Sequence, residues 1–334
     1  MINTLPISRR SFLASLSCLA LGQTLLGCET WSDQPVSIAA HLWPGYEPMF
    51  LARRENWLDS NQVQLLETNS ATETLQALIE GEVDGAALTL DETLKARATG
   101  LPLTVVLIFD ISTGADMLLA RPYIKQLADL KGQRLGFEQS SVGELMLAEI
   151  LSAAGLSRQE VKLMPLSIDQ HRAAWDRNQL DAVISYEPVA SQLLAQQGIK
   201  LFDSRQLPNN TIIDVLALRT DKLDYSHATA LRHLLAAHFR ALDYLNRNPQ
   251  DSAYRIASHL GLPAAEVLNA FKGLVLPDVS NNHRILAGAE PKLQIDAQKL
   301  SKLMVRNNLL KQEDTLSSLI RADFLPTDFH SYRP

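Results

Sequence analysis

The sequence predicts an α/β protein built of two lobes. From residue 34 onward, short apolar segments alternate with segments of helical period, which is the order of strands and helices in an α/β fold. The alternation stops near residues 112–116, restarts, and crosses back after residue 205, and the last third of the chain is almost wholly helical. We therefore expect a first lobe at 36–112, a second lobe at 113–210, and a return to the first lobe at 211–334.

The first residues have the pattern of an export signal. Arg9 and Arg10 precede an uncharged apolar run at 13–26 that is too short to span a bilayer comfortably, and the pair resembles a twin-arginine signal. Leu25-Leu26-Gly27-Cys28 is similar to a lipobox, although Leu26 replaces the usual smaller residue. We expect a signal peptide at 1–27, a lipidated linker at 28–35, and an exported protein, anchored through Cys28 at the outer face of the cytoplasmic membrane or in the periplasm. An ordinary signal peptide and an uncleaved anchor are the alternatives.

Composition excludes several classes of function. The formal net charge is −6, and about −8 once the leader is removed, which disfavours a nucleic-acid partner. Cys18 lies in the leader and Cys28 is the lipid acceptor, so the mature body has no thiol for catalysis, disulfides or metal binding. The eight histidines contain no H-x-x-x-H pair. We expect neither a metal nor a cofactor.

The first lobe opens on the segment around which the rest is organised. Val36 to Leu42 has the composition of a buried strand, and Trp43 to Glu47 forms a turn because it contains Pro44-Gly45. Pro48 can open a helix, where its missing N–H costs nothing. The later elements of this lobe are expected as a strand at 63–68, a helix at 72–79 behind the capping box of Ser70 and Glu73, a strand at 84–90, a helix at 91–100 and an apolar strand at 103–109.

The second lobe repeats the alternation. Strands are expected at 117–120, 134–137, 161–166, 180–185 and 199–202, with helices from about 140 to 154, 167 to 177 and 189 to 197. After a loop at 208 a strand leads to Arg219, and helices follow at 228–246, 250–260, 263–272 and about 293–308. These helices are expected to cover the first lobe.

Two turns occupy equivalent places in the two lobes. A helix and an aspartate precede a strand at Asp84 and again at Asp181, and the residues after these strands are Thr89-Leu-Asp91 and Tyr186-Glu187-Pro188. A true duplication and a shared turn chemistry explain this equally well.

These motifs together resemble a known family. The lipobox, Trp43-Pro44-Gly45-Tyr46-Glu47-Pro48, Val83-Asp84-Gly85-Ala86, Ser112-Thr113-Gly114 and Tyr186-Glu187-Pro188 look like solute-binding lipoproteins of ABC importers, of the nitrate/sulfonate/taurine and thiamine-pyrimidine-precursor type. The resemblance implies a type II periplasmic-binding-protein fold with two crossover strands, a monomer that delivers a small solute to a permease and its ATPase, and no catalysis. The enzymes of this fold that make the thiamine pyrimidine carry a cysteine-rich motif that this sequence lacks.

Strand-end turns and crossings supply the candidate ligand-binding residues. An aromatic ring beside a Pro-Gly turn is well placed to stack on a ligand, and a hydroxyl-rich helix start can hold an oxygen. Packing of the rings and simple helix capping are the alternatives, and capping is the expected role of Asp91. The candidates are Trp43, Tyr46, Thr89, Ser112, Thr113, Asp116, Ser140, Ser141, Tyr186, Glu187 and Asp214.

The charge of these loops bears on the ligand. They hold Glu47, Asp91, Asp116, Glu138, Glu187 and Asp214 but no Lys or Arg, so a neutral or cationic nitrogen heterocycle is favoured over a sulfonate- or nitrate-type anion. An enzyme that uses Glu187 with Asp116 or Asp214, or a ligand-sensing lipoprotein, is the alternative. The usual catalytic motifs are missing from the sequence.

Overall fold

Two β-sheets, one in each lobe, organise the chain. The structure is a computed structural model that describes residues 33–208 and 211–327, and within it the compact folded unit begins at Gln34. The predicted signal peptide and Cys28 lie outside these residues. In the described ranges, no helix combines the length and the apolar character needed to cross a membrane.

The first lobe contains a six-stranded mixed sheet. Strand β1 is parallel to β2 and β3, whereas β10 runs antiparallel between β3 and β4. Strands β1 to β4 therefore all run in one direction, and only the strand that returns from the second lobe enters between them in the opposite direction. In sheet order the strands are β11 (Leu274–Val275), β4 (Leu103–Ser112), β10 (Ile213–Arg219), β3 (Gly85–Thr89), β1 (Val36–His41) and β2 (Val63–Thr68).

The second lobe contains a five-stranded mixed sheet that is formed by one continuous stretch of chain. Strand β5 follows the first crossing and pairs antiparallel with both β8 and β9, while β6 is parallel to β7 and β8. In sheet order the strands are β7 (Lys162–Pro165), β6 (Arg134–Phe137), β8 (Ala182–Ser185), β5 (Met117–Ala120) and β9 (Ile199–Asp203).

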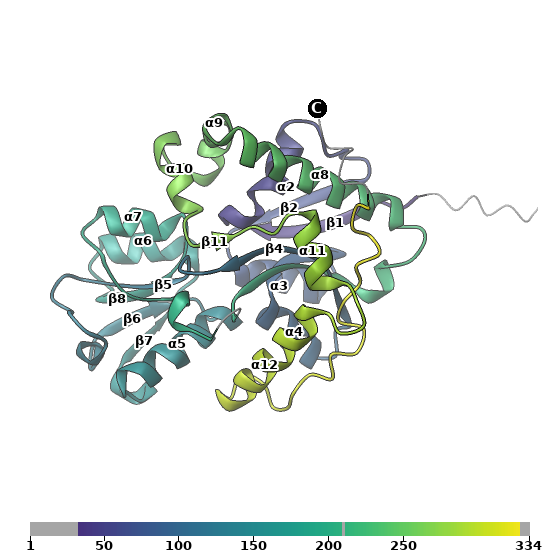
Figure 1. Ribbon diagram of the computed structural model, residues 1–334. Helices are drawn as coiled ribbons and strands as arrows, with labels where there is room; N and C mark the ends of the chain where they lie inside the picture. Colours follow the sequence, from purple (N-terminus) through teal and green to yellow (C-terminus); the bar gives the residue numbers. More distant parts are fainter. Residues whose placement is uncertain (1–32, 209–210, 328–334) are drawn as a thin grey trace, which may run out of the picture. The chain divides into compact units, whose positions relative to one another are not determined.

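Helices cover both faces of each sheet. Figure 1 shows α2 and α8 on one face of the first sheet and α3 and α4 on the other, with α6 and α7 opposite α5 around the second sheet. The helices are α2 (Glu47–Arg54), α3 (Ala71–Glu80), α4 (Leu90–Ala98), α5 (Ser141–Ala154), α6 (Ile168–Asp176), α7 (Val189–Ala195), α8 (Ala228–Arg247), α9 (Pro249–Leu260), α10 (Ala264–Ala270), α11 (Val279–Leu286) and α12 (Lys292–Arg306).

The two chain crossings between the lobes are bonded to each other. The hydroxyls of Ser112 and Ser204 lie 2.8 Å apart, and the Ser204 hydroxyl also accepts the Gly114 N–H at 2.6 Å. The Ser204 N–H in turn donates to the Asp116 carbonyl at 2.9 Å. A side chain at residue 114 would be strained, because its φ is +122°. The crossings thus form one bonded hinge region.

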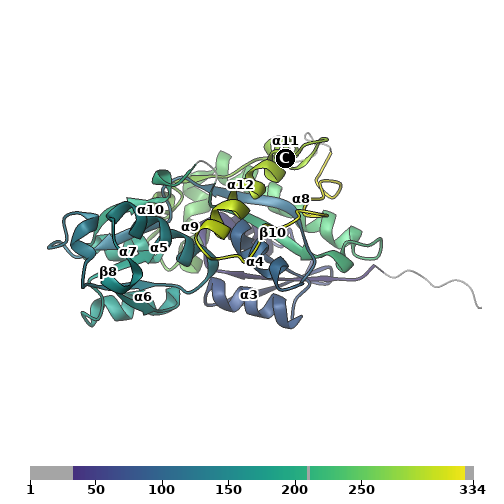
Figure 2. The ribbon, with the colours of Figure 1, turned by 90° about the horizontal axis from the view of Figure 1, so that it is seen from below.

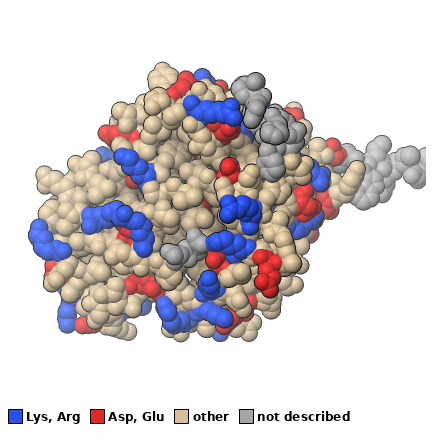
Figure 3. All heavy atoms as spheres, in the orientation of Figure 1, with Lys and Arg blue, Asp and Glu red and all other residues tan. Residues whose placement is uncertain are grey.

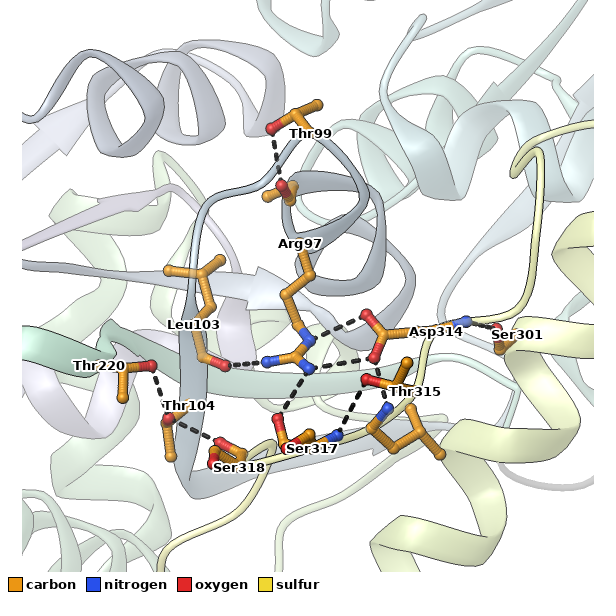
Figure 4. Close-up of polar contacts among 12 residues, drawn as sticks. Arg97, Thr99, Leu103, Thr104, Thr220, Ser301, Asp314, Thr315, Ser317 and Ser318 are labelled. Carbon is orange, nitrogen blue, oxygen red and sulfur yellow. Dashed lines mark hydrogen bonds and ion pairs between the residues drawn. The ribbon is translucent and has the colours of Figure 1, made fainter.

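The C-terminal third packs on the first lobe, as predicted. Helix α12 lies beside α4, which both views show (Figures 1 and 2). In the segment after α12, Asp314 accepts two hydrogen bonds from the Arg97 guanidinium, at 2.9 and 3.0 Å. The same guanidinium donates to the carbonyls of Leu103 and Ser317 (Figure 4). Arg97 therefore fastens the last loop to the start of β4.

One helix was missing from the sequence-based expectation. Helix α11 follows the short edge strand β11, and its buried Asn282 donates to the Ile108 carbonyl and accepts the Ile108 N–H. Asn282 thereby satisfies backbone groups in the middle of β4 that have no strand partner there. The segment is short and contains two asparagines, which are weak helix formers, so it gives little helical signal.

Candidate functional site

Two small adjoining cavities, of about 20 and 10 Å³, lie where the two lobes meet. Each is about the size of one water molecule, so the lobes are closed against each other in this structure. Asp116, Val142 and Tyr186 line both cavities. The other lining residues are His41, Trp43, Ala71, Thr89, Glu92 and Asp214 in the larger one, and Glu138, Ser140, Gly143, Met146 and Ile184 in the smaller one.

The aromatic turn after β1 is fixed by two aspartates. The Trp43 indole N–H donates to Asp110 Oδ2 at 2.9 Å, and the Tyr46 hydroxyl donates to Asp214 Oδ1 at 2.5 Å. Pro44 to Tyr46 form one 3-10 turn that continues directly into α2. Gly45 is required here, because a Cβ at this position would lie 1.7 Å from Asp110 Oδ2. Trp43 reaches the larger cavity, whereas Tyr46 is enclosed in the core and lines neither.

The two aspartates that hold this turn retain protons readily. Burial, more than any neighbouring charge, raises the pKa of Asp110 to about 7 and that of Asp214 well above its usual value. The charge of Asp110 further raises the pKa of Asp214, because two neighbouring carboxylates do not readily ionise together. The turn is therefore anchored by a carboxyl pair that is partly neutral near pH 7.

A second turn brings Glu92 to the cavity. Thr89 ends β3, and its N–H donates to Glu92 Oε2 at 3.0 Å at the start of α4. The other oxygen, Oε1, is buried without a hydrogen-bond partner among the described residues. Burial and the neighbouring Asp91 raise the pKa of Glu92 to about 8. The capping geometry therefore leaves one oxygen of this cavity-lining carboxyl without a described partner.

The second lobe contributes Asp116, Glu138 and Tyr186. Asp116 Oδ2 is also buried without a described partner, and burial raises the pKa of this carboxyl to about 6. Glu138 is fully bonded: Oε2 accepts the Tyr186 hydroxyl at 3.0 Å, while Oε1 accepts the N–H and hydroxyl of Thr72 at 2.9 and 2.8 Å. Because Thr72 lies in α3 of the first lobe, Glu138 joins the two lobes directly.

Three aromatic rings border the larger cavity. The Tyr186 ring meets the Trp43 ring edge-on at 5.6 Å and the His41 ring at 5.8 Å between centroids. Burial lowers the pKa of His41 to about 3, so this ring is neutral at physiological pH. The three rings pack edge to face around Tyr186 and give the cavity an aromatic, apolar border.

The structure gathers six of the eleven predicted ligand-binding residues around the cavities. These are Trp43, Thr89, Asp116, Ser140, Tyr186 and Asp214. Ser140 also accepts the Gly143 N–H at 3.4 Å as the N-cap of α5. Contact of any of these side chains with a ligand stays a prediction.

The other five lie elsewhere or are not described. Tyr46 is bonded to Asp214, Ser112 to Ser204, and Thr113 donates to the Gly273 carbonyl at 3.1 Å. The Glu187 carboxylate accepts the N–H and hydroxyl of Ser191 and lines neither cavity. Ser141 begins α5, and its side chain is outside the described set.

Sequence reasoning missed three residues of this site: His41, Glu92 and Asp110. Asp110 carried a usable signal, since it is the only charged residue in the apolar run of β4 and a charge there needs a partner. Glu92 looked like an ordinary residue of a capping box, and His41 like the polar end of a strand. Nothing local to either residue separates those roles from a place at the cavity.

The site carries carboxylates without basic partners. Neither cavity is lined by a described Lys or Arg, although both signs of charge are scattered over the molecular face in Figure 3. Within the described ranges, no group of three or more His, Cys, Asp or Glu side chains is arranged to hold a metal ion. The arrangement is suited to binding a group that donates hydrogen bonds.

Comparison with known proteins places the chain in a family. The family model described as NMT1/THI5 like matches residues 43–252, nearly two thirds of the sequence. The chain belongs to the NMT1/THI5-like family. This assignment confirms the resemblance identified from the sequence motifs.

The relatives of this NMT1/THI5-like protein include binding proteins and enzymes. A protein of Escherichia coli strain K12, provisionally named for aliphatic sulfonate binding, is 26% identical over 251 residues, 72% of this chain and 78% of its own length. The 4-amino-5-hydroxymethyl-2-methylpyrimidine phosphate synthase of Aspergillus parasiticus is 22% identical over 63% of this chain and 65% of its own.

Solved structures confirm the predicted fold. The alkanesulfonate-binding protein of Xanthomonas axonopodis pv. citri, solved with MOPS bound, has a TM-score of 0.71 and 22% identity, covering 87% of this chain and 99% of its own. The NMT1/THI5-like chain thus has the two-lobed, type II periplasmic-binding-protein fold.

Proposed function

We propose that this protein is the extracytoplasmic solute-binding lipoprotein of an ABC import system. It captures a small polar organic solute between its lobes and delivers it to a permease and its ATPase. The family, the two-lobed fold and the relatives named for sulfonate and taurine binding support this role. The cavities at the lobe interface support capture between the lobes.

The solute we favour is a neutral or cationic nitrogen heterocycle. The observation that carries this choice is the set of buried carboxyls around the cavities, with no described Lys or Arg among the lining residues. One uncompensated carboxylate at 4 Å costs an anion roughly 4 kcal/mol at an effective dielectric of 20. A helix N-terminus such as that of α5 stabilises a bound anion by at most about 2 kcal/mol. A sulfonate or nitrate is therefore disfavoured here, whatever the relatives bind.

Binding without catalysis is the function we assign, and synthesis of a pyrimidine is the second candidate. The named synthase among the relatives favours that candidate. The sequence lacks the cysteine-rich motif expected of those enzymes, and its two cysteines both precede the folded unit. Recovery of each solute chemically unchanged after incubation with the protein supports the binding role, and its conversion supports the synthase.

Titration followed by tryptophan fluorescence tests the ligand class. We expect aminopyrimidines to bind in preference to taurine, alkanesulfonates and nitrate, and Trp43→Ala to weaken that binding because it removes one ring of the cavity wall. Glu187→Gln tests the contact predicted for Glu187 and should leave the affinity unchanged if the Ser191 bonds are its whole role. Micromolar binding of a sulfonate, with no response to heterocycles, contradicts the ligand class but not the transport role.

Membrane attachment is tested separately, at Cys28. If this cysteine carries lipid, Cys28→Ser should block processing and move the protein from the membrane to the soluble fraction, because each buried CH₂ of an acyl chain contributes about 0.8 kcal/mol. Unchanged membrane association in this variant contradicts lipidation.

A further inference from the structure

We propose that the cleft holds the charged end of its solute between Glu92 and Asp116, as a planar cation that donates N–H groups to both carboxylates. Amidinium, guanidinium and protonated aminoheterocycle groups have this chemistry. The inference rests on the proposed function. It adds the sign of the ligand's charge and the two residues that bind the charged group.

Glu92 and Asp116 are two acids that line the larger cavity and that each have one unused oxygen. Glu92 Oε1 and Asp116 Oδ2 have no hydrogen-bond partner among the described residues, and both side chains line the larger cavity. Glu92 is 0% exposed and Asp116 is 6% exposed, so water satisfies these oxygens poorly. A buried acceptor without a donor is destabilising, and more so when it is charged, so a ligand that donates to both oxygens gains more than one that donates to neither.

The neighbouring carboxyls each have protein donors, and Asp110, whose Oδ1 is also without a described partner, lines neither cavity. Asp110 accepts the Trp43 indole, Asp214 accepts the Tyr46 hydroxyl, and Glu138 is bonded to Thr72 and Tyr186. These three acids position the cavity walls. Among the lining carboxyls, Glu92 and Asp116 are therefore the pair left to meet a ligand.

Two geometric features favour a planar cation over a simple ammonium. Glu92 comes from α4 of the first lobe and Asp116 from the crossing just before β5 of the second, so a group held by both carboxylates needs at least two N–H donors. The aromatic side chains of Trp43 and Tyr186 line the same cavity. Delocalised cations such as guanidinium combine fixed, divergent N–H donors with a face that packs on aromatic rings.

The described titratable groups around Glu92 and Asp116 are either acidic or neutral. Asp91, Asp110, Glu138 and Asp214 are the acids nearby, Tyr46 and Tyr186 are held neutral by raised pKa values, and His41 is neutral because burial lowers its pKa. Burial and the neighbouring Asp91 raise the pKa of Glu92 to about 8, so Glu92 keeps its own proton at pH 7. A bound cation replaces that proton.

Calorimetric titration with three matched probes tests the proposal. Benzamidine, benzamide and benzenesulfonate share one ring and carry a cationic, a neutral and an anionic group. We expect benzamidine to bind at least about tenfold more tightly than benzamide, and benzenesulfonate not to bind. Acetamidine, acetamide and methanesulfonate repeat the comparison for a smaller solute. Equal or weaker binding of the amidines, or no binding of either up to millimolar concentration, overturns the proposal.

Two variants and a matched control assign the effect to these residues. Glu92→Gln and Asp116→Asn should each weaken amidine binding about tenfold or more and weaken amide binding less. Glu144→Gln is the control, because Glu144 is a mostly buried acid of the second lobe that lines neither cavity and whose partner is Arg158. Amidine affinity that is the same in all three variants overturns the assignment.

Proton release separates this inference from the proposed function. Titration of benzamidine at pH 7 in two buffers of different ionisation enthalpy should reveal release of a proton, and Glu92→Gln should abolish it. If a neutral or anionic solute binds and closes the lobes without releasing a proton, the transport role stands and the cation site is refuted. If no solute of any charge binds, both fail.

Discussion

Asp110 and Asp214 are direct cross-strand neighbours on β4 and β10, and each accepts a hydrogen bond from one ring of the aromatic turn after β1. The strand that enters the first lobe from the second thus helps to hold the turn that forms the cavity wall. Because Asp214 lies at the start of β10, directly after the return crossing, the position of the aromatic turn is linked to the hinge region.

Gly45→Ala should destabilise the first lobe. The added Cβ would overlap Asp110 Oδ2 and lie 2.8 Å from the Trp43 indole nitrogen, so the turn or the aspartate must move. We expect a loss of about 1–3 kcal/mol in the free energy of unfolding, measured by urea denaturation. In an Asp110→Ala background the same substitution should cost less, because the closest clash is gone; an unchanged cost would show that the strain lies in the backbone instead.

Stability should fall as the pH rises above 6.5. Glu92 has a pKa of about 8 when folded, against 4.5 for an ordinary glutamate, so the folded chain holds a proton that the unfolded chain releases. Its contribution to stability is complete below about pH 4.5 and is lost as the pH rises through about 8. Below pH 6.5, the buried His41 and His238, whose pKa values are near 3, act in the opposite direction.

Glu92→Gln isolates this contribution. Between pH 6.5 and 7.5 the wild-type free energy of unfolding should decrease more steeply than that of the variant, by about 1 kcal/mol per pH unit. Thermal unfolding of both proteins at several pH values in this window gives the comparison. Parallel curves would mean that Glu92 is ionised in the folded protein.

Glu138→Gln should open the ligand-free molecule. The Glu138 carboxylate caps the start of α3 across the lobe interface through Thr72, an interaction worth up to about 2 kcal/mol when partly buried. Small-angle scattering should show a larger radius of gyration for this variant without ligand. Glu144→Gln, whose partner Arg158 lies in the same lobe, should leave the radius unchanged.

Ligand binding should reverse the Glu138→Gln effect in part. A solute that binds between the lobes favours the closed form, so it should reduce the radius of gyration of both wild type and variant. Identical radii with and without a bound solute would argue against hinge closure.

Asp314→Ala should loosen the C-terminal loop. The Arg97–Asp314 pair is 10% and 8% exposed, and removing the carboxylate leaves a mostly buried guanidinium with only carbonyl partners. Breaking a buried pair in this way costs about 3–5 kcal/mol. Urea denaturation measures the loss, and Asp323→Ala, which removes an exposed pair with Arg321, should cost less than about 1 kcal/mol.

The elements of both lobes could be predicted because their signals are local. Capping residues, Pro and Gly stops and apolar runs fixed β1, β3 and α5 to within a few residues. Two features could not be predicted this way. The direction of β10 depends on pairing with strands more than a hundred residues earlier, and α11 depends on the contact of Asn282 with β4.

The candidate site was only partly predictable for a similar reason. A strand-end turn identifies Trp43 and Tyr186, but whether a side chain reaches the cavity depends on its neighbours across the interface. Tyr46 lies in a turn where a ligand contact is expected, but its side chain is buried and its hydroxyl donates to Asp214. Glu92 occupies a helix-capping position in the sequence. One of its oxygens makes the capping bond, and the other has no described partner.

The position of β10 between β3 and β4 also governs how the chain can assemble during synthesis. The second sheet comes wholly from residues 117–203, so that lobe can form as soon as this stretch has left the ribosome. The first sheet lacks a central strand until residues 213–219 follow, and until then β3 and β4 each present an open edge. The lobe made first is therefore completed last, and a nascent or truncated chain that ends before β10 is the form most exposed to aggregation.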